Sequence, residues 1–144
     1  MCGNIVEKDS RQKRAAFIGR WQPWHLGHEW LIHQKSDLGI PILILVRDIP
    51  PDPNNPFTTE QTVELIQTAL DDLDVIVQVI PDIESVNWGR GVGYATNEFC
   101  PPSDVAVISA TEIRRQVMIG EDQWRGKVSP KIWDKVAEFL LTHG

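Results

Sequence analysis

Residues 41–46 most constrain the fold, because they read Pro-Ile-Leu-Ile-Leu-Val without a polar side chain. A continuous apolar run of this length is typical of a buried strand in a parallel sheet covered on both faces. Residues 15–19 and 75–80 are further short apolar runs, the first ended by a glycine and the second followed by a proline. With a shorter run at residues 104–108, we predict four strands.

Helical patterns lie between and after these runs. Helical spacing or a capping residue marks the segments 28–39, 58–70, 109–119 and 130–141. Alternating strands and helices imply a parallel sheet with right-handed crossovers. In such sheets, ligands bind beyond the carboxyl ends of the strands. We therefore predict an α/β protein whose site lies where the loops after the first and fourth strands converge.

The length of 144 residues fits one domain. We predict a flexible N-terminal tail at residues 1–14 and a single domain at residues 15–144. The formal net charge of -6 argues against a partner nucleic acid, because coating it requires clustered Lys and Arg. Small anions remain candidate ligands, because a few arginines and a helix N-terminus can form a positive pocket in an acidic protein.

No segment approaches the roughly 18 apolar residues of a membrane span, and the charged start of the chain does not resemble a signal peptide. Cys2 and Cys100 are too few for a disulfide framework. We therefore expect a cytoplasmic protein that binds no membrane. Trp124 and Trp133 fit either an internal core or the interface of a homo-oligomer, and the pattern alone does not decide.

Residues 19–28 carry the strongest functional signal, Gly-Arg-Trp-Gln-Pro-Trp-His-Leu-Gly-His, between a predicted strand and a predicted helix. Gly19 and Gly27 let the backbone approach phosphate groups, and the helix N-terminus offers free N–H groups. His25 and His28 can donate hydrogen bonds to phosphate oxygens. The segment therefore predicts a triphosphate site.

Two other interpretations of this segment stay open on the residues alone. Both histidines can be surface residues while Trp21 and Trp24 merely pack. Two histidines three positions apart can also bind a metal ion, although the sequence places no third ligand.

Residues 108–115, Ile-Ser-Ala-Thr-Glu-Ile-Arg-Arg, lie where a predicted strand meets a predicted helix. Ser109 or Thr111 can cap this helix and also contact a phosphate, and Arg114 reaches the same side one turn later. Alone, the pattern is equally explained by ordinary helix capping.

Together, the two segments resemble the signatures of the HxGH nucleotidyltransferase superfamily, a GRFQPxHxGH-like loop and an ISxTxIR-like helix start. The resemblance covers about residues 15–141, with Trp21 and Trp24 where phenylalanines are commoner. It implies a Rossmann-like, doubly wound parallel sheet, a nucleoside triphosphate donor and pyrophosphate as the leaving group. It also implies that Mg²⁺ is carried by the nucleotide phosphates, so we expect no metal ligand from the protein.

Within this superfamily, the chain is most similar to archaeal-type nicotinamide-mononucleotide adenylyltransferases. Three segments are similar to theirs: NPFT at residues 55–58, PDI...W at residues 81–88 and EDQW at residues 121–124. The chain departs from the family at Gln61 and Thr62, where a Glu-Arg pair is usual.

The resemblance implies in-line attack by an acceptor phosphate oxygen on the α-phosphorus, without a protein nucleophile. The implied catalytic residues are His25, His28 and Arg114. Nucleotide binding is expected of Gly19, Arg20, Trp21, Gly27, Ser109 and Thr111. Acceptor binding is expected of Arg47, Asn55, Trp88 and Arg90. Without the resemblance, Arg47 fits a salt bridge with Asp48, and Trp88 fits the core.

The leading hypothesis is the transfer of AMP from ATP to a small phosphorylated acceptor, with nicotinamide mononucleotide the first to try. A cytidylyltransferase that uses CTP and a phosphorylated alcohol or sugar would carry the same motifs. A nucleotide-binding module without turnover is a third hypothesis, because the altered helix at Gln61 and Thr62 is compatible with a lost acceptor site. Residues 89–94, Gly-Arg-Gly-Val-Gly-Tyr, lack the spacing and the preceding strand of a dinucleotide fingerprint.

Overall fold

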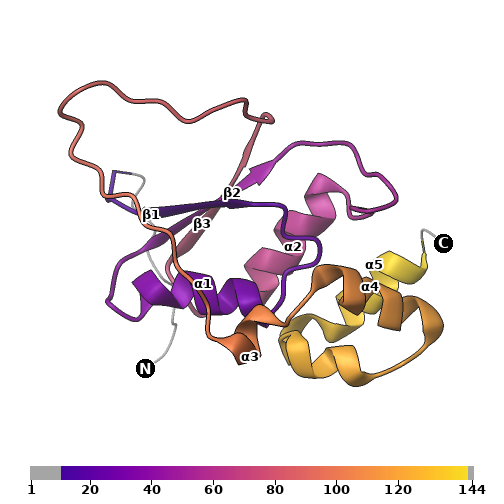
Figure 1. The fold of residues 1–144 in the computed structure, drawn as a ribbon. Helices are drawn as coiled ribbons and strands as arrows, with labels where there is room; N and C mark the ends of the chain where they lie inside the picture. Colours follow the sequence, from indigo (N-terminus) through magenta and orange to yellow (C-terminus); the bar gives the residue numbers. More distant parts are fainter. Residues whose placement is uncertain (1–10, 143–144) are drawn as a thin grey trace.

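The computed structural model describes residues 11–142. A 3-stranded parallel sheet, in the order β1-β2-β3, consists of β1 (Ala15–Gly19), β2 (Ile42–Arg47) and β3 (Val75–Ile80). Helix α1 (Leu26–Ser36) connects β1 to β2, and α2 (Thr59–Ala69) connects β2 to β3. This arrangement, visible in Figure 1, confirms the predicted α/β, Rossmann-like class.

Both connecting helices pack on the same face of the sheet. Consecutive strands are neighbours, and two right-handed crossovers in one direction place α1 and α2 on one side. Ile42, Ile44 and Val46 are buried on this side, whereas Leu43 and Leu45 on the opposite side are half-buried. The expectation of a strand covered on both faces therefore holds for one face only, because both crossovers run over that face.

The predicted fourth strand at residues 104–108 is not formed. Ser103–Ala106 is instead a short helix, α3, which begins after Pro102. The N–H groups of Val105 and Ala106 both donate to the Pro102 carbonyl, at 3.0 and 2.8 Å. These local hydrogen bonds satisfy donors that a strand would have offered to the sheet. Within residues 11–142, β1 accordingly pairs only with β2.

Capping residues begin the second and fourth helices where the sequence predicts. The Thr58 hydroxyl accepts from the Gln61 N–H, and the Gln61 side chain accepts from the Thr58 N–H, both at 3.0 Å. Ser109 caps α4 (Ala110–Ile119), and its hydroxyl accepts from the Glu112 N–H at 3.2 Å. Each side-chain oxygen replaces a hydrogen-bond partner that the first turn of a helix lacks.

The C-terminal part of the chain packs against α2. Its elements are η1 (Gln123–Lys127), η2 (Pro130–Ile132) and α5 (Trp133–Leu141). The helix predicted at residues 130–141 is thus divided into a 3₁₀ turn and an α-helix. Trp124 is buried in the core and Trp133 packs against it, so both belong to the internal core. None of the helices within residues 11–142 is long and apolar enough to cross a membrane.

Arg14, just before β1, connects the start of this strand to the starts of β2 and β3. Its Nη1 atom lies 2.9 Å from the Asp74 carboxylate and donates to the carbonyl groups of Ile42 and Asp74. Arg14 is the last residue of the predicted N-terminal tail, yet its side chain is buried against the sheet. The tail residues 1–10 lie outside the described part of the chain.

Residues 81–102 form an extended segment, nearly all of it exposed. Figure 1 shows this segment arching away from the strands before it returns to α3. Trp88 is 58% exposed within it. The interpretation of Trp88 as a core residue is therefore wrong, because no apolar surface packs around this segment.

Two isoleucines on adjacent strands test the one-sided core. Ile44 is 0% exposed and Ile18 is 43% exposed. We expect Ile44→Ala to lower the free energy of unfolding by about 2–5 kcal/mol, because it removes buried methylene groups and leaves a cavity. Ile18→Ala should cost about 1 kcal/mol or less, because its side chain already contacts water. Urea unfolding of both variants measures this difference, and equal losses would contradict burial on a single face.

Candidate nucleotide-binding site

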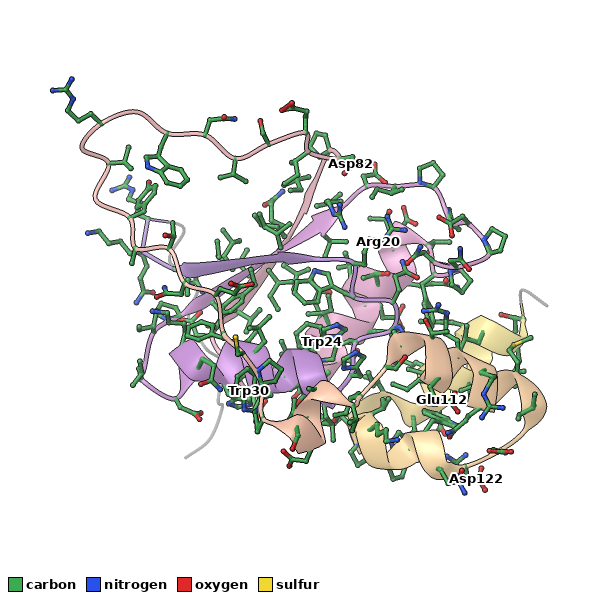
Figure 2. The ribbon with its side chains drawn as sticks, in the orientation of Figure 1. Arg20, Trp24, Trp30, Asp82, Glu112 and Asp122 are labelled. Atoms are coloured by element: carbon green, nitrogen blue, oxygen red, sulfur yellow. The ribbon has the colours of Figure 1, made fainter. Side chains whose placement is uncertain are left out.

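Two buried indoles hold the loop that follows β1. The Nε1 group of Trp21 donates to the Leu45 carbonyl at 3.1 Å, and that of Trp24 donates to the Glu29 carboxylate at 3.2 Å. Figure 2 shows Trp24 between the sheet and the helices, where its side chain is 0% exposed. Trp21 has a left-handed backbone with φ 54°, which costs about 1–3 kcal/mol for a residue with a side chain. Burial of its indole and the hydrogen bond to β2 offset this strain.

Both glycines of the loop make room for a neighbouring ring. A Cβ atom on Gly19 would lie 2.9 Å from the ring of Trp21. A Cβ atom on Gly27 would lie 2.8 Å from the His25 Cε1 atom. The sequence predicts that these glycines let the backbone approach phosphate groups. The structure shows that they are also needed for packing within the loop itself.

The backbone fixes the proton position of both histidines. The Nδ1 atom of His25 accepts from the Gly27 N–H at 3.0 Å, and the Nδ1 atom of His28 accepts from the His25 N–H at 3.1 Å. A neutral imidazole whose Nδ1 accepts a hydrogen bond carries its proton on Nε2. The two rings stack with centroids 3.7 Å apart. The pair therefore presents two Nε2–H donors at the start of α1.

Burial keeps both rings uncharged near neutral pH. It lowers the pKa of His25 to about 4. Burial, followed by repulsion from a charged His25, holds the pKa of His28 well below its usual value. His25 is buried and His28 half-buried, so the interpretation of both as surface residues is wrong. They can bind an anion as neutral hydrogen-bond donors, not as cations.

The second motif reaches the first through Arg114. Its Nη1 atom donates to the Gln22 carbonyl at 2.6 Å, across 92 positions of sequence. Its Nη2 atom lies 3.4 Å from the Thr111 hydroxyl, one turn earlier on α4. The cap at Ser109 starts the helix so that Thr111 and Arg114 share the face toward the loop. The predicted convergence of the two motifs is thus formed.

A cavity of about 460 Å³ lies between the two motifs. Ligand pockets commonly have volumes of about 300–1,000 Å³, so this one has the size for a nucleotide. Its walls include six of the predicted catalytic and nucleotide-binding residues, Gly19, Arg20, Trp21, His28, Thr111 and Arg114. His25, Gly27 and Ser109 do not line it. His25 contacts the lining residue His28, the Gly27 N–H holds His25, and Ser109 caps the helix that carries Thr111 and Arg114.

Two of the predicted acceptor residues lie next to this cavity. Asn55 lines it, and the Asn55 Oδ1 atom accepts from the Arg20 Nε–H at 3.3 Å. Arg47 and Asn55 also line a smaller cavity of about 10 Å³, which is space for about one water molecule. Arg47 Nη1 lies 3.5 Å from the Asp82 carboxylate, so the alternative pairing with Asp48 is wrong. The Arg47 Nε atom is buried without a hydrogen-bond partner.

The other two predicted acceptor residues are not brought to the site. Trp88 and Arg90 lie on the exposed segment after β3, and neither lines either cavity. Gly91 and Gly93 in this segment have positive φ angles of 84° and 76°, which favour glycine. The segment follows β3 only after several extended residues, so it lacks the strand-to-helix turn of a dinucleotide site.

The sequence interpretation missed Gln22. It lies inside the first motif and lines both cavities, and its side chain and carbonyl bind two distant segments. Its glutamine side chain, followed by proline in a loop between glycines, was the available signal. Its partners are 35 and 92 positions away, so the motif did not reveal them.

Within residues 11–142, no group of three His, Cys, Asp or Glu side chains is placed to hold a metal ion. The polar side chains that line the main cavity include Arg20, His28, Thr111 and Arg114, all of which can donate hydrogen bonds to an anion.

These features define the class of the protein: a Rossmann-like α/β domain with a cavity between the loop after its first strand and the start of α4. No protein-family model matches the chain. It is 28% identical over 158 residues to the nicotinamide-nucleotide adenylyltransferase of Methanolobus tindarius, with 88% of each chain covered. This similarity confirms the predicted resemblance to archaeal enzymes of that name.

Two further relatives match more closely over shorter stretches. The nicotinamide-nucleotide adenylyltransferase of Methanospirillum hungatei is 37% identical over 76 residues, which cover 51% of this chain and 43% of the relative. The enzyme of the same name from Methanosphaerula palustris is 37% identical over 93 residues, covering 63% of this chain and 55% of the relative. The chain thus spans about half the length of these two relatives.

Acidification should destabilise the fold through the buried histidines. Below pH 6.5 the unfolded chain protonates His25, while the folded chain keeps it neutral down to about pH 4. The unfolded state then binds more protons, so stability falls as the pH drops through this window. For His25 alone, we expect a loss of about 2 kcal/mol between pH 7 and pH 5. Urea unfolding at both pH values measures it.

The matched variants are His25→Asn, which lacks the buried ring, and His33→Asn, which changes a half-buried histidine on the same helix, α1. The first should show a weaker pH dependence of unfolding, and the second should behave like the parent protein. An unchanged pH dependence in His25→Asn would show that His25 does not cause the effect.

Proposed function

We propose that the chain is a nucleotidyltransferase that transfers AMP from ATP to a small phosphorylated acceptor and releases pyrophosphate. One observation carries the proposal: His28, Thr111 and Arg114, from two distant motifs, line one nucleotide-sized cavity at the carboxyl end of the sheet. Three archaeal relatives named nicotinamide-nucleotide adenylyltransferase support nicotinamide mononucleotide as the acceptor.

In the proposed reaction, the triphosphate binds between the start of α1 and the start of α4. The Nε2–H group of His28 donates to a phosphate oxygen, His25 holds the His28 ring in place by stacking against it, and Arg114 supplies positive charge to the leaving pyrophosphate. A phosphate oxygen of the acceptor attacks the α-phosphorus in line. The bond to the bridging oxygen of the pyrophosphate breaks, and no protein side chain forms a covalent bond. Catalysis then depends on positioning and on charge stabilisation.

Mg²⁺ would enter as a complex with the nucleotide and neutralise charge on the phosphates. Mg²⁺ keeps several water molecules and commonly uses substrate phosphates as ligands. The lining side chains suit this arrangement, because Thr111 and Arg114 offer hydrogen-bond donors to phosphate, and His28 offers an Nε2–H while its Nδ1 atom accepts from the His25 N–H.

A second candidate function is nucleotide binding without turnover. The observation that favours it is the position of Trp88 and Arg90, which lie outside both cavities. Arg47 and Asn55 favour the transferase, because both line the smaller cavity and so place a guanidinium and an amide next to the donor site.

The first experiment is to incubate the protein with Mg²⁺, either ATP or CTP, and nicotinamide mononucleotide. We expect pyrophosphate and a dinucleotide product from ATP, read by phosphate assay and mass spectrometry. If product formed only with CTP, the chain would be a cytidylyltransferase and not an adenylyltransferase. Nucleotide binding without product across a panel of phosphorylated alcohols, sugars and nucleotides would favour the second candidate function.

His28→Ala should lower kcat by about 10²–10³-fold, the usual effect of removing one preorganised donor to a developing charge. His33→Ala is the matched control, because His33 is on the same helix but pairs with Asp37 at the surface. It should leave kcat within about twofold. Thermal unfolding establishes that both variants fold. Near-normal turnover in folded His28→Ala would remove His28 from the mechanism.

Arg47→Ala should raise the KM for the acceptor by about tenfold or more, because it removes a charged hydrogen-bond donor from the acceptor side. The KM for ATP should change little. Arg90→Ala is the matched control, since Arg90 is exposed and lines neither cavity. Steady-state kinetics with each substrate varied in turn measures both KM values. A larger rise of the acceptor KM in Arg90→Ala than in Arg47→Ala would contradict the placement of Arg47 on the acceptor side.

A further inference from the structure

The side chain of Gln22 forms hydrogen bonds with both backbone groups of Phe57, in the loop before α2. Its Oε1 atom accepts from the Phe57 N–H at 3.0 Å, and its Nε2 group donates to the Phe57 carbonyl at 3.2 Å. Phe57 is 1% exposed, so both of its backbone groups lie where water cannot easily replace these partners. The same Nε2 group lies 3.5 Å from the hydroxyl of Thr62, a buried residue of α2.

The main chain of Gln22 binds the other side of the site. Its carbonyl accepts from Arg114 Nη1 at 2.6 Å, which is a short, charge-assisted hydrogen bond. One residue thus contacts α4 through its backbone and the loop before α2 through its side chain. These partners are 92 and 35 positions away in sequence.

The loop anchored by Gln22 carries a residue of the acceptor side. Asn55 lies two positions before Phe57, lines both cavities and binds Arg20 at 3.3 Å. Arg114 also lines the main cavity. The position of Asn55 relative to Arg114 therefore depends on a short path through Gln22.

The sequence around α2 makes this contact specific to the residues present. Thr62 occupies a position where an arginine is usual in the resembling family, and its side chain is 1% exposed beside Gln22. Gln61, at the other altered position, forms the cap with Thr58. With this small buried threonine beside it, the Gln22 amide faces the backbone of Phe57.

We infer that Gln22 is a positioning residue that couples the nucleotide side of the site, through Arg114, to the acceptor side, through Phe57 and Asn55. The inference rests on the proposed function for its kinetic consequence. It also has a consequence that needs no turnover: binding of ATP at Arg114 should change the protection of the Phe57 amide.

The decisive variant is Gln22→Met, which keeps the length of the side chain and removes both hydrogen bonds to Phe57. Hydrogen exchange of the Phe57 amide should be at least tenfold faster than in the parent protein. ATP should slow this exchange in the parent protein and have little effect in the variant. The KM for the acceptor should rise at least tenfold, while the Kd for ATP from calorimetry changes less than threefold, since the Gln22 carbonyl remains.

Two further variants separate positioning from a general structural role. Thr62→Val removes the hydroxyl at 3.5 Å and keeps the shape, so exchange and KM should stay within twofold. Gln22→Glu retains an oxygen that accepts from the Phe57 N–H, so it should recover part of the lost protection.

Unchanged Phe57 exchange in Gln22→Met would overturn the anchoring role. The coupling would be overturned if ATP did not slow exchange of the Phe57 amide in the parent protein. It would also be overturned if ATP slowed this exchange equally in Gln22→Met. If the parent protein releases no pyrophosphate but ATP still slows Phe57 exchange, the proposed function fails and the coupling stands. An equal rise in acceptor KM in Thr62→Val would instead indicate general loosening of α2.

Discussion

Burial of the two indoles after β1 is the interaction on which the site depends. Trp24 and Trp21 fill space between the sheet and the helices, so the loop must pass through the core before α1 begins. The indole N–H of Trp21 donates to Leu45 of β2, and that of Trp24 donates to Glu29 of α1, so the loop is attached to both elements. The histidine pair follows directly, because His25 is both the residue after Trp24 and the N-cap of α1. An apolar requirement of the core thereby sets the position of polar donors.

The C-terminal half of the chain completes this arrangement from a distance. α4 begins at its Ser109 cap, and Arg114 on its first turns reaches back to the loop after β1. Trp124 in the core attaches the segment after α4 to the rest of the molecule. The site is therefore formed by a loop that is rigid because of local packing and a helix that is placed by long-range burial.

Short sequence patterns predicted correctly those elements whose formation depends on neighbouring residues. The three strands follow from apolar runs, and the starts of α2 and α4 follow from Thr58 and Ser109. Residues 104–108 failed as a strand because Pro102 offers a nearby carbonyl to their N–H groups, a competition that apolar content does not register. The placement of residues 81–102 and the partners of Gln22 depend on contacts between distant parts of the chain, so no window of sequence contained them. The family resemblance suggested Trp88 and Arg90 for the acceptor, and only the folded chain shows that they lie apart from the cavities.

The neutral state of the histidine pair separates two stages of recognition. Hydrogen bonds from uncharged rings act only at contact distance, whereas charges act over about 10 Å at ordinary ionic strength. In a chain with a net charge of -6, long-range attraction of an anionic nucleotide falls mainly to Arg114, because Arg20 and Arg47 are paired with Asp52 and Asp82. Salt should then slow the arrival of the nucleotide far more than it weakens the contacts made to the rings afterwards. The site divides capture and retention between two chemically different sets of donors.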